Sequence, residues 1–220
     1  MTKPEIFKGL DEYAGITDAK DIVKNVFRSI LLEEQWHEEF YLHPLGFYYC
    51  RLFLSSSEQV RLHIWAPDYI KKQDLFIHDH YYDLCSWVLC GTIRDYAYSV
   101  KPSNVPTQHI VYTSGYHADQ NIRTIAPTSE YKLVSVEAER LIVAPKKYFI
   151  SRETFHANEV LFDQAELAVT LVYAYNYKAE HRPNIIGQAG AEHGGENESE
   201  IQSEVKVTDL IQKAEKIIFS

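Results

Sequence analysis

The feature that most constrains the fold of this chain is a long series of short β-type segments between positions 47 and 175. These segments are rich in aromatic and β-branched residues, and turn signals such as the serines at 55–57 and Gly91 separate them. Many short strands at close spacing are typical of β-sandwiches and barrels. We therefore predict an all-β-dominated fold with strands at 47–54, 60–65, 75–80, 86–89, 93–100, 108–113, 131–136, 141–143, 148–150, 159–162 and 167–175.

Helical patterns lie near the two ends of the sequence. At the N-terminal end, apolar residues recur at helical spacing from Ile22 to Leu31, and Thr17 is a suitable N-cap. At the C-terminal end, a second apolar stripe runs from Leu210 to Ile218. We expect this second helix to dock on the β-structure or on a partner.

A change in composition divides the chain. Residues 180–204 include a glycine- and glutamate-rich stretch with almost no large apolar side chains, which is typical of a linker. Residues 187–199 are expected to be mobile, because they bury too little apolar area to offset the entropy of ordering. The predicted segments are an N-terminal helical segment at 1–42, a barrel at 43–179 with an inserted excursion at 101–130, a flexible linker at 180–204 and an amphipathic helix at 205–220.

Charge and cysteine content exclude several classes of partner. The chain has 31 acidic and 22 basic residues, for a net charge of −9, which argues against nucleic acid and anionic membranes as partners. Its three cysteines do not form a disulfide framework, and no signal-type or membrane-spanning apolar run is found. A cytoplasmic protein that acts on a small molecule is expected, and a homodimer is left open.

A histidine motif carries the clearest chemical signal. In a strand, residues i and i+2 point to the same face, so His78 and His80 project together while Asp79 points away. A third histidine, His156, lies far downstream after a strand and a polar turn. Imidazole suits iron, zinc, copper and nickel. We predict that the three histidines bind one metal ion, with Asp83 as a fallback fourth ligand; three satisfied core histidines are the alternative.

The order of these motifs resembles that of the cupin superfamily. A histidine pair is followed by a glycine, Gly91, and the distant histidine is followed closely by Asn158. The resemblance covers about residues 43–177 and implies a cupin-type barrel, that is, a double-stranded β-helix or jelly roll. Two departures stand out. Cys85 occupies the place where the cupin motif usually has a glutamate ligand, and the glycine usual before the downstream histidine is missing.

A cysteine in place of the glutamate resembles the cysteine dioxygenase family of thiol dioxygenases. In that family three histidines bind iron, and an arginine in a Tyr-x-Arg motif, here Tyr49 and Arg51, holds the substrate carboxylate. A tyrosine on the last barrel strand, here Tyr173 or Tyr175, links to the cysteine, here Cys85. The resemblance implies Fe(2+) and a small thiol or amino-acid-like substrate that reacts with dioxygen. Zinc, nickel or manganese would also fit three histidines.

The residues leave competing functions open. His63 shares a strand face with Arg61 and Trp65, and we predict that it supports the metal site from behind the ligands. The first hypothesis is a non-haem iron dioxygenase. The alternatives are another metal-dependent cupin enzyme, such as an isomerase, lyase or non-thiol oxygenase, and a non-enzymatic small-molecule-binding cupin.

Overall fold

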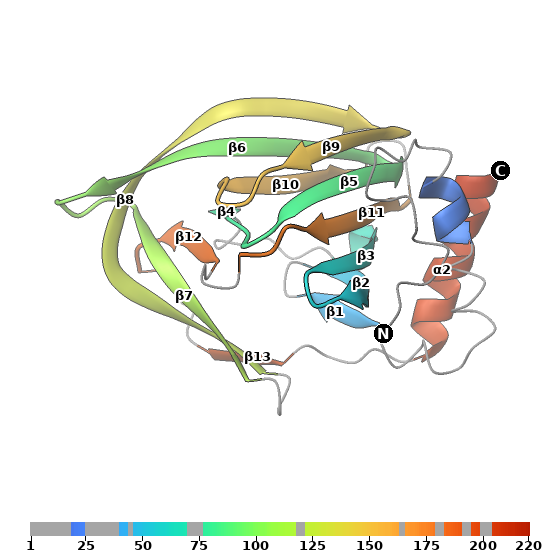
Figure 1. The fold of residues 1–220 in the computed structure, drawn as a ribbon, viewed down its shortest axis with the longest axis horizontal. Coiled ribbons are helices and arrows are strands. Elements are labelled where there is room, and N and C mark those ends of the chain that lie inside the picture. The colour runs from blue at the N-terminus through green and yellow to red at the C-terminus, as the bar shows by residue number, and fades with distance from the viewer. Residues whose placement is uncertain are drawn as a thin grey trace.

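The computed structural model contains two antiparallel β-sheets that face each other, with helical residues from both ends of the chain against one of them (Figure 1). The prediction of a fold dominated by β-structure with helices at the two ends is therefore confirmed. The structure describes residues 19–24, 40–43, 46–69, 77–117, 122–162, 166–178, 183–190, 195–198 and 204–220.

The first sheet consists, in order across it, of β1 (Tyr41–His43), β2 (Phe47–Ser55), β3 (Glu58–Trp65), β11 (Ala168–Tyr175), β5 (Asp83–Cys90) and β9 (Lys146–Ile150). A short 3-10 helix, η3 (Pro67–Tyr69), follows β3. Because side chains alternate along a strand, each strand of this sheet contributes to two different faces. We call the face toward the second sheet the inner face and the opposite one the outer face.

The second sheet consists, in order, of β13 (Gly195–Glu198), β8 (Ile122–Val143), β6 (Thr92–Ser103), β10 (His156–Leu161), β4 (Ile77–His78), β12 (Asn184–Gln188) and β7 (His109–His117). The long strand β8 pairs with β6 through its C-terminal part and with β7 through its N-terminal part. Strand β7, at the end of this order, therefore also pairs with β8 near its beginning, and the order of paired strands closes on itself. The predicted excursion at 101–130 corresponds to the end of β6, to β7 and to the start of β8, which extend away from the helices (Figure 1).

Helices cover the outer face of the first sheet. Residues 19–24 are helical, and the C-terminal helix α2 spans Glu204–Phe219. Ile211 and Ala214 of α2 are fully buried in one core cluster with Leu62 and Leu171 of the sheet. The predicted C-terminal helix thus docks on this chain's own β-structure. No helix in the described part of the chain is long and apolar enough to cross a lipid bilayer.

The two helical segments also contact each other. The Nζ atom of Lys20 donates a hydrogen bond to the backbone oxygen of Ile218 at 3.1 Å, and Lys24 lies over the ring of Phe219. Ala19 and Val23 are fully buried in the same core cluster. The remainder of the predicted N-terminal stripe, after position 24, lies outside the described residues.

The inner face of the first sheet packs on the second sheet. Side chains such as Trp65, Val88 and Val172 from the first sheet form a core cluster with Ile93 and Ile142 from the second. This apolar cluster fixes the separation of the two sheets. It therefore supports the polar group described below, which lies between the same two layers.

Part of the segment predicted to be a flexible linker is a paired strand. Strand β12 lies inside the segment predicted to be a flexible linker, where it pairs with β4 and β7. Ile186 is buried in a core cluster with Ile77 and Val111. The glycine- and glutamate-rich composition of the surrounding residues concealed two adjacent isoleucines, which are enough to anchor a short strand.

Candidate metal centre

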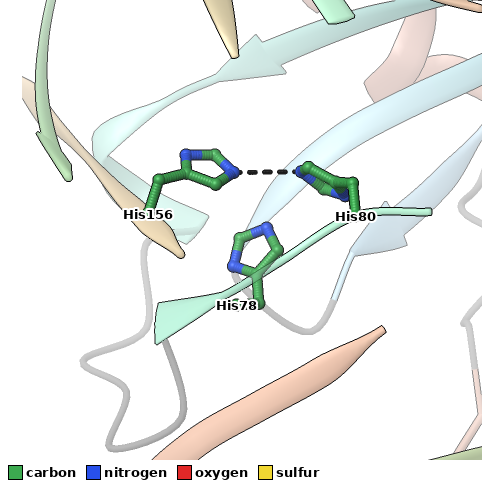
Figure 2. A group of neighbouring side chains, drawn as sticks. All are labelled: His78, His80 and His156. Carbon is green, nitrogen blue, oxygen red and sulfur yellow. Dashed lines mark hydrogen bonds between the residues drawn. The ribbon is translucent and has the colours of Figure 1, made fainter. Parts of the chain in front are cut away.

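Three histidines converge between the two sheets. His78 lies on β4, His80 follows two residues later, and His156 is the first residue of β10. His156 lies directly opposite His78 in the antiparallel pair of β10 and β4. Figure 2 shows the three rings pointing toward one another, with centroids 4.6 to 5.1 Å apart.

The ring nitrogens lie near enough to one another for small side-chain movements to bring all three to one ion. One ligand atom from each histidine lies within 4.8 Å of the others. The Nε2 atoms of His80 and His156 are 3.0 Å apart. Two nitrogens that bind one ion at right angles, each about 2.1 Å from it, are separated by about 3 Å. The arrangement of the three side chains therefore suits metal coordination without a change of backbone.

Asp95 supports His156 from behind. Its Oδ1 atom lies 3.4 Å from Nδ1 of His156, and its Oδ2 atom accepts a hydrogen bond from Nε of Arg140 at 2.7 Å. Asp95 is only 1% exposed. Burial alone would raise the pKa of this carboxyl, but the hydrogen bonds from His156 and Arg140 lower it below its usual range. Asp95 thus stays ionised, holds the proton of His156 on Nδ1 and leaves the Nε2 lone pair for a metal.

The other two aspartates near the histidines point elsewhere. Asp79 is buried and accepts two hydrogen bonds from Asn184, one from the backbone nitrogen at 2.6 Å and one from the side-chain amide at 3.0 Å. Asp83, the predicted fallback ligand, accepts hydrogen bonds from the backbone nitrogen of Arg152 and from the amide of Asn176. Neither carboxylate belongs to the group of possible metal ligands among the described residues. The candidate ligand set is therefore three neutral imidazoles.

Burial and nearby charges favour the neutral form of the His80 imidazole. Burial lowers the pKa of His80 well below its usual range, and the neighbouring histidines and Arg61 lower it further. Burial and the charge of Arg61 likewise lower the pKa of His63 to about 3. A neutral imidazole has a free lone pair, so a low pKa favours metal binding over protonation.

His63 lies on the inner face among aromatic rings. Its ring centroid is 4.8 Å from that of Phe47 and 5.4 Å from that of Trp65. The charge on His63 influences His80, so the two residues are electrostatic neighbours. A role for His63 behind the ligands therefore remains a prediction.

The guanidinium of Arg51 packs on aromatic side chains of its own strand. Arg51 lies on the inner face, as the predicted substrate clamp requires, but its guanidinium lies over the rings of Tyr49 and Phe53. Phe53 is 61% exposed, and Arg51 itself is half-buried. Arg61, directly opposite it in the pairing of β2 and β3, is the arginine whose charge reaches the histidines. The structure thus offers a different arginine from the one that the Tyr-x-Arg motif indicates.

The structure does not bring Cys85 or Tyr173 to the histidines. The two residues are cross-strand partners, but both lie in the core cluster on the outer face, beneath the helices. Burial raises the pKa of Cys85 to about 12, so its thiol stays protonated. The Tyr173 hydroxyl hydrogen-bonds Glu58, and its ring stacks on Tyr175. The predicted catalytic roles are corrected here, because strand alternation turns both side chains away from the site.

The sequence alone did not indicate Asp95 or Gln59 as residues of the site, and it gave Arg61 no role beyond sharing a strand face with His63. Asp95 is a charged residue two positions after the buried Ile93, on a strand whose alternate residues face inward. Gln59 and Arg61 share the parity of His63 on β3. A charged residue at an inward strand position is the signal that would have indicated them, since such residues are seldom buried without a function or a partner.

The comparisons with known proteins found only distant likenesses. No family model matches the sequence, and no curated protein sequence matches it. Among solved structures, an RmlC-like cupin from Shewanella frigidimarina is 11% identical, with 68% of this chain and 90% of that chain covered and a TM-score of 0.35.

Two metabolic enzymes are also similar to this chain. The DMSP lyase DddQ from Ruegeria pomeroyi is 11% identical, with 63% of this chain and 50% of that chain covered and a TM-score of 0.33. Hydroxypropylphosphonic acid epoxidase from S. wedmorenis is 12% identical, with 62% and 54% covered and a TM-score of 0.34. This chain spans about half the length of either enzyme. Likenesses at this level say nothing of activity, and the function below follows from this chain's own side chains.

Proposed function

We propose that this chain is a metal-dependent enzyme of the cupin type, a non-haem iron dioxygenase that acts on a small thiol or amino-acid-like substrate. The observation that carries the proposal is the neutral ligand set. His78, His80 and His156 converge, while the nearby carboxylates are engaged in other hydrogen bonds. Three imidazoles leave the whole charge of a divalent ion uncompensated, which favours an anionic ligand such as a substrate thiolate.

The protein residues have defined parts in this proposal. A metal held by His78, His80 and His156 would supply Lewis acidity and would bring a thiolate and dioxygen together. Asp95 orients His156 through the hydrogen bond to Nδ1. Tyr82 stacks on His80, with ring centroids 4.7 Å apart, and so restricts the orientation of that ring. The protein thus contributes mainly by positioning the two reactants.

The proposed reaction is balanced without a further reductant. A thiol would be converted to a sulfinic acid, in which both atoms of dioxygen are bonded to sulfur. Sulfur supplies all the electrons that dioxygen takes up, and the thiol proton passes to the sulfinate or to solvent. The proposed reaction therefore needs no electron donor among the protein side chains.

The test combines metal analysis with oxygen consumption. Protein purified without added metal is assayed for bound iron, zinc, nickel and manganese, and then for oxygen uptake with a panel of small thiols and amino acids. Iron together with substrate-dependent uptake is the expected result. Iron-loaded, folded protein that consumes no oxygen with any thiol or amino acid would overturn the dioxygenase proposal and leave a metal-dependent isomerase, lyase or binding protein.

A further inference from the structure

We infer that Asn184 of β12 is a positioning residue of the metal centre, because it holds Asp79, the residue between two of the candidate ligands. Docking of β12 and binding of the metal therefore stabilise each other. The inference deepens the proposed function, on which it rests only for the presence of the metal. It gives a part in the site to a strand from the segment that the sequence predicts to be a linker.

Three hydrogen bonds join Asp79 to Asn184. The backbone nitrogen of Asn184 donates to Oδ1 of Asp79 at 2.6 Å, and the side-chain amide of Asn184 donates to Oδ2 at 3.0 Å. In the reverse direction, the backbone nitrogen of Asp79 donates to the backbone oxygen of Asn184 at 3.2 Å. Asp79 is only 2% exposed, so the contact is shielded from water and is stronger than it would be on an open surface.

Asp79 lies in the short stretch of backbone that carries two of the candidate ligands. It separates His78, the last residue of β4, from His80, so a shift of Asp79 displaces both imidazoles. The two ring centroids are 4.8 Å apart. Because the distances from a metal to its ligand nitrogens tolerate a change of only about 0.2 Å, holding Asp79 in place preserves the geometry that the ion needs.

Strand β12 also provides most of the described pairing of β4. Strand β10 pairs with β4 through one residue pair, His156 with His78. Strand β12 pairs with β4 through two, Ile185 with His78 and Ile186 with Ile77. Along its other edge β12 pairs with β7 through five residue pairs. Strand β12 therefore connects the ligand pair to the rest of the second sheet.

A separate contact holds the ligand pair at its other end. The backbone nitrogen of Glu153, in the turn before His156, donates to the backbone oxygen of His80 at 3.0 Å. Two segments that are far apart in the sequence thus restrain the pair, one at Asp79 and one at His80. Because a change of the Asn184 side chain leaves the second contact and the strand pairing in place, we expect variants at this position to fold.

Thermodynamic linkage makes the coupling reciprocal. If docked β12 raises the affinity for a metal by some factor, the bound metal raises the equilibrium constant for docking of β12 by the same factor. Residues that orient metal ligands commonly change the affinity by about ten- to a hundredfold. Since Asn184 acts through Asp79 and not on a ligand atom, we expect about tenfold, both in metal affinity and in the protection of β12 against hydrogen exchange.

The experiment uses the full chain with cobalt(II), whose absorption spectrum depends on coordination geometry. Competition with a chelator gives the affinity, and mass spectrometry follows hydrogen–deuterium exchange of peptides from β12 and α2 with and without cobalt. In the wild type, cobalt should slow exchange of β12 about tenfold more than exchange of α2. Asn184→Ala should lose this difference, bind cobalt about tenfold more weakly and show an altered spectrum. Wild-type affinity, spectrum and β12 protection in folded Asn184→Ala overturn the inference.

An exchanged pair tests the hydrogen bond itself. Asn184→Asp sets two carboxylates against each other and should weaken cobalt binding at least as much as Asn184→Ala does. Adding Asp79→Asn again places an amide donor opposite a carboxylate acceptor and keeps the original net charge, so the affinity should return.

Leu171→Ala is the matched control, because it weakens the apolar core under the helices and leaves Asp79 untouched. It should keep the wild-type affinity and the protection of β12 by cobalt. If the folded exchanged pair does not recover the affinity, or if Leu171→Ala loses as much affinity as Asn184→Ala, the effect is one of general stability and the inference is wrong.

The outcomes separate this inference from the proposed function. If cobalt protects β12 through Asn184 but the iron-loaded protein takes up no oxygen with any thiol or amino acid, the positioning role stands and the dioxygenase proposal fails. If oxygen uptake is present and Asn184→Ala behaves as the wild type does, the reverse holds. A folded chain that binds neither cobalt nor iron contradicts both.

Discussion

The two faces of the first sheet are built from the same strands but differ in what they contact. On the outer face, Cys85, Trp87 and Leu171 are buried under the helices in an apolar cluster. On the inner face, Arg61 and His63 lie toward the second sheet, and the charge of Arg61 lowers the pKa of His80. Along one strand, alternate side chains therefore pack in the apolar core under the helices or face the candidate metal site. Substitutions on the outer face should alter the free energy of unfolding, and those around the inner site should alter metal and ligand binding.

The largest effect is expected at His156, which lies between β4 and β6 in the second sheet. In His156→Ala one of three metal ligands is lost, so metal binding should weaken by about a hundredfold or more, beyond the usual loss from a residue behind the ligands. Metal content after dialysis, measured by mass spectrometry, checks this. Full metal retention would mean that the three histidines are only a polar cluster.

A substitution on the outer face should lower the stability of the fold and leave metal binding unchanged. Leu171 is fully buried under the helices, and Leu171→Ala should lower the free energy of unfolding by about 2–5 kcal/mol through lost contacts and a cavity. Urea unfolding of the metal-free protein measures the change. Metal affinity of the folded molecules should stay at the wild-type value, and a matching fall in affinity would show that the two faces are not independent.

Asp95→Asn tests the support of the metal site from behind. The amide preserves the size of the side chain but removes the charge that holds the proton of His156 on Nδ1. Metal affinity should fall by about ten- to a hundredfold. Competition with a chelator of known affinity gives this ratio. Arg140→Gln, which removes the hydrogen bond from Arg140 to Asp95 but leaves the contact between Asp95 and His156, is the control and should have a smaller effect.

The pH dependence of stability should reveal His63. Burial and Arg61 lower the pKa of His63 in the folded chain to about 3, whereas in the unfolded chain it is near the ordinary 6.5. The unfolded state therefore binds more protons between these values, so stability is full above about pH 6.5 and decreases as the pH falls toward 3. His63→Phe should flatten this decline in the free energy of unfolding. If the free energy of unfolding of His63→Phe depends on pH as in the wild type, His63 is hydrated in the folded protein and does not cause the decline.

The smallest effect is expected at Cys85. Because burial raises the pKa of its thiol to about 12 and the side chain faces the helices, Cys85→Ala should retain metal content and any oxygen uptake. Mass spectrometry of the wild type should show no covalent bond between Cys85 and Tyr173. A cross-linked species, or loss of oxygen uptake in a folded variant, would contradict the assignment of Cys85 to the stabilising face.

Local sequence patterns predicted the elements better than their extents. The expected strands at 131–136 and 141–143 are one strand, β8, because the charged residues between them pair with β6 while their side chains remain exposed. A strand with one face in solvent tolerates charge without interruption, so polarity alone is a poor boundary signal. Strand β12 was missed for the related reason that its apolar content is confined to two residues.

The sequence by itself determined which residues share a face. Alternation along a strand places Tyr49 with Arg51, whatever the rest of the fold does. It also determined the amphipathic C-terminal helix, since its stripe needs an apolar surface. Only the tertiary structure decided which face of each strand points inward, because this depends on where the helices dock. That choice places Arg61 beside the histidines and turns Cys85 and Tyr173 away from them, and it follows from packing between residues far apart in the chain.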